Sequence, residues 1–146
     1  MKTKFLIIVF SFLNCWVFSQ YRCPMNGGTN ILSQLNPDFY PYGHPDETRD
    51  RIQSKNNQVI SVSSGKVVKI IQSDSDYSII IKSSSDNFFV YSNLSNTLFK
   101  ENDSVEKDQL LGLAIYDKYY ASYVMDFQFW KKDESVKVDL KCSNPD

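Results

Sequence analysis

The chain offers few of the groups on which enzyme chemistry usually depends. It holds a single histidine, His44, among 146 residues. That count excludes any zinc site that needs two imidazole ligands, and it leaves one candidate for imidazole acid–base catalysis. A Gly-x-Ser-x-Gly nucleophile motif is absent, and the five glycines are scattered rather than gathered in a phosphate-binding loop. No familiar nucleophile or nucleotide-binding motif therefore defines a function.

One predicted strand, Tyr119–Trp130, separates polar from apolar side chains. Because side chains alternate along a strand, Met125, Phe127 and Phe129 share one face and are expected in the core. The other face carries Val124, Asp126, Gln128 and Trp130. Asp126 and Gln128 are therefore expected to face either a binding groove or the solvent, and the strand alone does not decide between them.

Strands of this kind dominate the second half of the chain. Short segments rich in β-branched and aromatic residues recur between polar breaks, and no segment combines helical periodicity with helix caps. This spacing predicts one mainly β domain, an antiparallel β-sandwich or barrel-like fold. The expected strands are Gln58–Ser63, Lys66–Gln72, Tyr77–Lys82, Asn87–Tyr91, Gln109–Tyr116, Tyr119–Trp130 and Ser135–Leu140.

A long polar segment, Asn36–Asn57, precedes the strands. It contains three prolines, the only histidine and a charged run from Asp46 to Arg51. A loop of this length in a compact domain is usually functional or disordered. Both a functional loop and a solvated N-terminal extension fit the composition.

The N-terminus is typical of a secretory signal peptide. Lys2 and Lys4 precede an apolar stretch, Phe5–Phe18, and polar residues follow Ser19. The apolar stretch is shorter than the about 20 residues that span a bilayer. We therefore expect a signal peptide at residues 1–19, a secreted or periplasmic protein, and no stable membrane span after cleavage; an uncleaved anchor is the alternative.

Two cysteines, Cys23 and Cys142, remain after such cleavage and lie near opposite ends of the chain. An even pair in an oxidising compartment predicts a disulfide, with two free thiols as the alternative.

The net charge of −1 lacks the basic excess typical of nucleic-acid binding, so we expect no nucleic-acid partner.

The order of the strand signals resembles a known family. The resemblance covers about residues 46–129, and its most specific part is Val105–Gly112, which resembles the family's valine, lysine, glutamine and glycine turn. The remaining matching segments are Val59–Val68, Tyr77–Lys82, Phe89–Leu94 and Val124–Phe129. Together they resemble the lysostaphin/LytM-type zinc metallopeptidases, which cut peptidoglycan cross-bridges. The resemblance implies a small antiparallel β-domain with a groove across its sheet, here at residues 46–140, between an extension at 20–45 and a tail at 141–146.

The family's zinc ligands and catalytic histidines are mostly replaced. Counting back from Gly65 puts the family's ligand aspartate at Asp50 and the histidine four residues earlier at Asp46. The His-x-His strand aligns its two histidines with Val124 and Asp126. The Tyr-x-His-Leu motif aligns with residues 91–94, so Tyr91 is kept and Asn93 stands at the histidine position. His44 lies two residues from the first ligand position and is a possible substitute ligand.

These replacements change the chemistry that the resemblance implies. If Asp46, Asp50 and Asp126 gather at one point, they need a cation or a raised carboxyl pKa, and oxygen ligands suit Ca²⁺, Mg²⁺ or Mn²⁺ better than Zn²⁺. Asn93 cannot accept a proton at neutral pH. We therefore expect a secreted, non-catalytic domain that binds peptidoglycan, a peptide or an envelope protein in a groove with Tyr91, Asn93 and Gln128. An active metal-dependent peptidoglycan endopeptidase and a β-domain similar in architecture alone are the alternatives.

Overall fold

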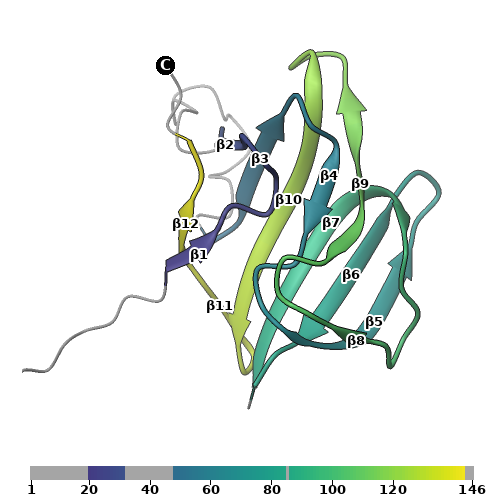
Figure 1. Ribbon diagram of the computed structural model, residues 1–146, viewed down its shortest axis with the longest axis vertical. Helices are drawn as coiled ribbons and strands as arrows, with labels where there is room; N and C mark the ends of the chain where they lie inside the picture. Colours follow the sequence, from purple (N-terminus) through teal and green to yellow (C-terminus); the bar gives the residue numbers. More distant parts are fainter. Residues whose placement is uncertain (1–19, 32–47, 85, 144–146) are drawn as a thin grey trace, which may run out of the picture.

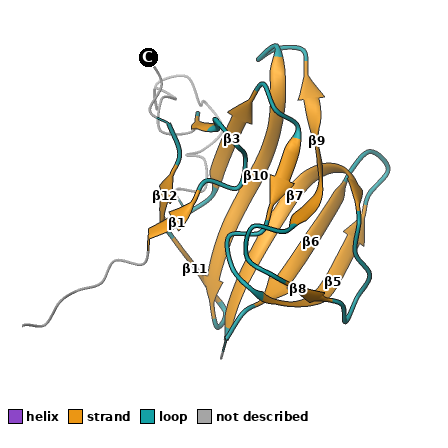
Figure 2. Cartoon of the chain, viewed as in Figure 1, coloured by secondary structure: helices purple, strands orange, loops and turns teal. Residues whose placement is uncertain are grey.

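The computed structural model describes residues 20–31, 48–84 and 86–143. Every regular element in these residues is a strand, which confirms the mainly β fold (Figure 2). No helix in this part of the chain is long and apolar enough to cross a membrane. The strands are β1 Gln20–Arg22, β2 Thr29–Asn30, β3 Asp50–Ser54, β4 Gln58–Ile60, β5 Gly65–Gln72, β6 Tyr77–Lys82, β7 Asn87–Thr97, β8 Ser104–Val105, β9 Leu110–Asp117, β10 Ser122–Lys131, β11 Glu134–Val136 and β12 Asp139–Lys141.

Ten of these strands form one antiparallel sheet (Figure 1). Its order is β2-β3-β10-β9-β7-β6-β5-β8, with β11 paired to β10 and β4 paired to β9. Strands that follow one another in the chain are often neighbours, as in β5-β6-β7, because short polar turns join them. The polar residues 73–76 lie between β5 and β6, and the polar residues 83–86 lie between β6 and β7.

The sheet forks along β10. Asp126–Lys131 pairs with the first half of β7, whereas Ser122–Val124 pairs with β9. Beyond the fork, Leu94–Thr97 of β7 pairs with β9 instead of β10. The strand β7 must therefore leave β10 between Ser92 and Leu94, at the position of Asn93.

The core lies on one face of this sheet, which we call the inner face. Met125, Phe127 and Phe129 are all buried there, as their alternation predicts. Their register partners Ile52, Tyr91 and Phe89 are buried on the same face. Other members of the cluster close over them from β4, β9 and the N-terminal segment: Met25, Val59, Val62, Leu111 and Ala114.

A second, two-stranded sheet ties the ends of the described chain together. β1 and β12 run parallel, with Arg22 opposite Lys141, so the next residue of each strand comes side by side. These residues are Cys23 and Cys142, and they form the expected disulfide. Gly28 lies so close to Cys23 and Ile52 that a Cβ atom at this position would overlap with both side chains. The surroundings of the disulfide are therefore tightly packed.

The strand boundaries differ from expectation in the polar part of the chain. β3 lies within Asn36–Asn57, which the composition had indicated as a loop. Its inner-face residues are Asp50, Ile52 and Ser54, so only one of three buried side chains is apolar. The segment expected as one strand at Ser135–Leu140 is divided into β11 and β12, and β10 begins after a turn at residues 118–121.

Candidate functional site

The residues expected to form one site lie on both faces of the sheet. Asp126 is in register with Arg51, and Phe127 is in register with Asp50. Side chains of register partners point to the same side, and successive side chains alternate. Asp126 therefore projects from the outer face, opposite the core, whereas Asp50 projects into the inner face. The structure does not bring these two carboxylates together.

On the outer face, Asp126 is held by an arginine. Arg51 donates from Nε to Oδ1 at 2.8 Å and from Nη2 to Oδ2 at 2.9 Å, so both carboxylate oxygens are engaged. Planar two-point pairing of this kind is stronger than a single hydrogen bond. The hydrogen bonds with Asp126 raise the pKa of Arg51 further above its ordinary value, although partial burial acts in the opposite direction. Arg51 thus remains a cation that neutralises Asp126.

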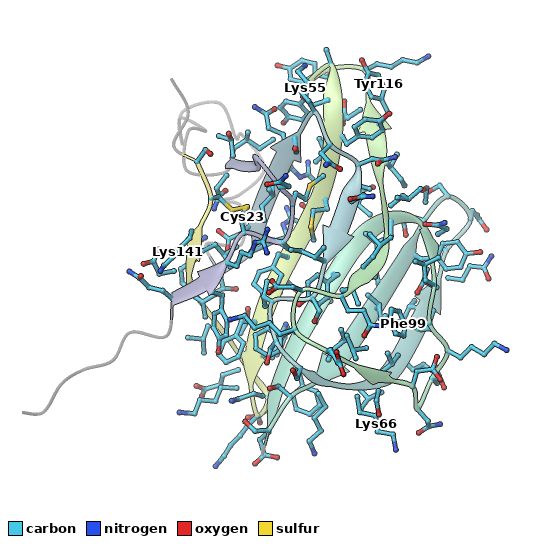
Figure 3. The ribbon with its side chains drawn as sticks, viewed as in Figure 1. Cys23, Lys55, Lys66, Phe99, Tyr116 and Lys141 are labelled. Carbon is cyan, nitrogen blue, oxygen red and sulfur yellow. A yellow bond between two sulfur atoms is a disulfide. The ribbon has the colours of Figure 1, made fainter. Side chains whose placement is uncertain are left out.

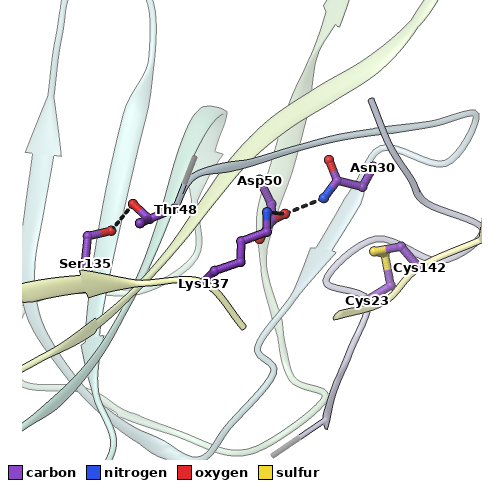
Figure 4. Close-up of polar contacts among 7 residues, drawn as sticks. All are labelled: Cys23, Asn30, Thr48, Asp50, Ser135, Lys137 and Cys142. Carbon is purple, nitrogen blue, oxygen red and sulfur yellow. Dashed lines mark hydrogen bonds and ion pairs between the residues drawn. A yellow bond between two sulfur atoms is a disulfide. The ribbon is translucent and has the colours of Figure 1, made fainter. Parts of the chain in front are cut away.

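On the inner face, Asp50 is almost fully buried, with 1% of its surface exposed. Its Oδ1 accepts hydrogen bonds from the amide of Asn30 and from the ammonium group of Lys137 (Figure 4). Lys137 follows β11 and reaches the carboxylate from a half-exposed position. The second oxygen, Oδ2, is buried without a hydrogen-bond partner in the described residues. Asp50 therefore also carries a lysine counter-charge from its own chain.

Asn93 supports the fork of the sheet. Its backbone has a φ of 64°, a left-handed conformation that asparagine tolerates better than most residues. Its side-chain amide donates a 2.6 Å hydrogen bond to the carbonyl oxygen of Val124, across the gap where β7 leaves β10. Val124 itself is buried. The two positions aligned with catalytic histidines are therefore occupied by a structural amide and a buried aliphatic side chain.

Because of this role of Asn93, replacement by glycine is expected to cost less stability than replacement by alanine. Asn93→Ala should lower the free energy of unfolding by about 2 kcal/mol, because alanine loses the hydrogen bond and strains the left-handed backbone. Asn93→Gly should cost less, about 1 kcal/mol, because glycine removes more atoms but accepts the same φ. Urea denaturation of both variants measures the difference, and an alanine variant as stable as the glycine variant would contradict the strain.

The other expected site residues have different surroundings. Tyr91 does not line a groove: it is fully buried, and its hydroxyl accepts a hydrogen bond from the backbone N–H of Val62. Burial raises the pKa of Tyr91 above its usual value, so the hydroxyl stays neutral. Gln128 does lie on the outer face, where it lines an open groove. Asp46 and His44 lie outside the described residues.

The surroundings of Asp50 and Asp126 differ from those of the zinc ligands that the resemblance implies. Both oxygens of Asp126 bind Arg51, and Asp50 is on the opposite face with Lys137 as its counter-charge. No group of three histidine, cysteine, aspartate or glutamate side chains in the described part of the chain could hold a metal ion. Asp50 and Asp126 therefore do not fit the family's zinc.

The comparisons with known proteins agree with the fold. Residues 48–138 match Peptidase family M23. The match covers more than half of the 146 residues, so the chain belongs to this family and the likeness is more than one of architecture. No curated protein matches the chain in sequence.

Solved structures show the same fold at low sequence identity. A chain of the SpoIIQ–SpoIIIAH pore-forming complex is 15% identical, with a TM-score of 0.65 over 82% of this chain and 88% of that one. The catalytic domain of EnpA, a prophage-encoded M23 protein from Enterococcus faecalis, is 18% identical, with a TM-score of 0.55 over 70% and 82%. Lysostaphin is 20% identical, with a TM-score of 0.55 over 68% of this chain and 44% of its own.

Sequence reasoning missed the cations that engage the expected ligands. In the sequence, Arg51 is only the last residue of a charged run, and Lys137 is only one residue of the expected strand Ser135–Leu140. One signal in the sequence could have indicated this arrangement. Arg51 directly follows Asp50, and if the segment is a strand, the side chains of Asp50 and Arg51 point to opposite faces of the sheet.

Proposed function

We propose that this chain is a non-catalytic M23 domain that binds peptidoglycan, a peptide or a partner protein. The main observation behind the proposal is that Arg51 donates hydrogen bonds to both carboxylate oxygens of Asp126. A metal ion at this position would have to displace a guanidinium that is already matched to the carboxylate in charge and shape. The aligned catalytic positions, Asn93 and Val124, supply no general base.

The comparisons support a binding role without defining the ligand. One protein with the same fold is part of a pore-forming complex between SpoIIQ and SpoIIIAH. We extend to this chain only the idea that an M23-type fold can act by binding another protein. The apolar stretch Phe5–Phe18 supports a place outside the cytoplasm, in the periplasm or beyond the cell.

The proposed loss of activity is tested with purified peptidoglycan. We expect no soluble fragments after incubation with the protein and Zn²⁺, Mn²⁺, Mg²⁺ or Ca²⁺, because no side chain at the aligned positions can activate water. An active M23 peptidase under the same conditions is the positive control, and turbidity together with chromatography of released fragments gives the measurement. Cleavage that a chelator abolishes and Asp126→Ala removes would contradict the proposal.

The competing hypothesis is an active endopeptidase with an aspartate-rich metal site. The buried, unpartnered Oδ2 of Asp50 is the one observation in its favour, because a buried carboxylate oxygen usually has a partner. This hypothesis requires stoichiometric metal in the purified protein and its loss in Asp50→Asn. Elemental analysis of both proteins after dialysis distinguishes the two hypotheses without any activity measurement.

A further inference from the structure

The groove that Gln128 lines on the outer face of the sheet extends well beyond the expected site residues. Its volume is about 460 Å³, and its lining residues come from β5, β6, β7, β10 and the turn after β10. Figure 1 labels these four strands of the large sheet. Register pairs define the floor of the groove: Ile80 lies opposite Val90, which lies opposite Gln128, and Phe88 lies opposite Trp130. The sheet has a bulge between Val67 and Lys69, and the intervening Val68 also lines the groove. The floor is thus apolar, with Gln128 as a polar exception.

One end of this groove is cationic. Lys66 lies directly opposite Lys82, which lies opposite Phe88, so these side chains extend the row of Phe88 and Trp130 across the face. The ammonium group of Lys82 stands 5.6 Å from the centre of the Phe88 ring. Figure 3 shows Lys66 at the end of the molecule opposite Tyr116. A third lysine, Lys132, lines the groove itself.

These three lysines have no anionic partner in the described part of the chain. The four ion pairs found there involve Arg22, Arg51, Lys69 and Lys137. Asp86 and Asp133 are in the adjoining turns, but neither forms an ion pair with these lysines. Like charges directly opposite each other destabilise a sheet. Because the whole chain has a net charge of −1, this cationic row is a local feature and not a result of composition.

The hairpin turn after β10 fixes the position of Lys132. Lys131 pairs with Glu134, so Lys132 is the first of two residues in a tight hairpin turn, and its φ is 58°. Glycine, asparagine or aspartate is usual at such a position. The turn therefore places a lysine, instead of one of these small residues, beside the groove that it lines.

We propose that this groove binds an extended, apolar segment of a partner protein whose acidic residues lie against Lys66, Lys82 and Lys132. The inference rests on the proposed binding function and adds the chemistry of the partner and its direction along the groove. Apolar side chains of the segment contact Ile80, Val90 and Trp130. Carboxylates at the end of the bound segment lie near the lysine ammonium groups and reduce the repulsion between them.

The test uses the purified protein and two synthetic peptides. One is an acetylated octapeptide of alternating leucine and threonine that ends in two aspartates, and the other ends in two asparagines with an amidated terminus. Fluorescence of Trp130 reports binding, with Trp130→Phe as the blank; the other tryptophan, Trp16, lies in the expected signal peptide. We expect the acidic peptide to bind about tenfold more tightly than the neutral one, and less tightly as salt concentration rises.

Variants separate the contribution of charge from that of folding. Lys82→Glu combined with Lys132→Glu should weaken binding of the acidic peptide by about tenfold, whereas Lys118→Glu, on the exposed turn between β9 and β10, should leave it unchanged. Lys132→Gly should bind the acidic peptide less tightly without any fall in melting temperature, since glycine accepts the positive φ.

Each outcome bears on a separate claim. Equal affinity for the two peptides would overturn the acidic partner and leave a binding role for the domain intact. No change in Trp130 fluorescence with either peptide would overturn the groove as the binding site. The loss of peptidase activity is decided by the peptidoglycan experiment and the metal analysis, so the two proposals fail independently.

Discussion

Removing the Cys23–Cys142 disulfide should lower the free energy of unfolding by about 4 kcal/mol. The bridge joins residues 119 positions apart, so it closes a loop that contains most of the folded domain. In the chain-entropy model, a cross-link over a loop of this length stabilises by roughly 4–5 kcal/mol, because it restricts the unfolded chain. Cys23→Ala combined with Cys142→Ala is the appropriate variant, and urea denaturation is the measurement.

The redox state of the solution supplies the control. A reductant should destabilise the wild-type protein to the level of the double variant and have no effect on that variant. A loss below about 1 kcal/mol would mean that β1 and β12 hold the chain ends together without the covalent bond, contrary to the loop-closure argument.

Replacing Arg51 by alanine should cost about 2–3 kcal/mol of stability. Arg51 supplies both hydrogen bonds to Asp126, whose side chain is only 14% exposed, so its loss leaves a largely buried carboxylate without a counter-charge. Removing one partner of such a pair costs more than the pair contributes, because the remaining charge is desolvated and unpaired. Replacing both residues by leucine should restore much of the lost stability.

Lys69→Ala is the matched control for Arg51→Ala. Lys69 pairs with Glu101 at 3.3 Å, but both side chains are well exposed, so we expect little change in stability. The Arg51→Ala variant also tests the reading of Asp126 as a former metal position. If divalent cations restored the lost stability, Asp126 would be a functional metal ligand, and the account of an arginine-occupied position would be wrong.

The sequence alone was sufficient for the fold and for part of the site. Alternation in residues 124–130 correctly assigned Met125, Phe127 and Phe129 to the core, because a strand has only two faces and one of them was wholly apolar. The two cysteines correctly indicated a disulfide. The ordered strand signals indicated the family that the match over residues 48–138 confirms.

Predictions from local sequence patterns were wrong where polar residues are buried, or where the backbone interrupts the two-residue alternation of side chains along a strand. The composition predicts a loop at β3, because Asp50 and Ser54, which fill its buried face, are residue types that usually face the solvent. Tyr91 was expected in a groove with Asn93, two residues away on the same face of an ideal strand. The positive φ at Asn93 and the fork of the sheet interrupt the alternation, so Tyr91 and Leu94 are both buried.

The sequence by itself determined that this protein is an antiparallel β-domain with a single histidine, since residue types and their periodicity are local properties of the chain. Only the tertiary structure decided which side chains surround Asp50 and Asp126. Arg51 meets Asp126 across 75 residues, and Lys137 meets Asp50 across 87. Strand register brings these charges together, and it depends on the packing of the whole sheet rather than on any segment of the sequence.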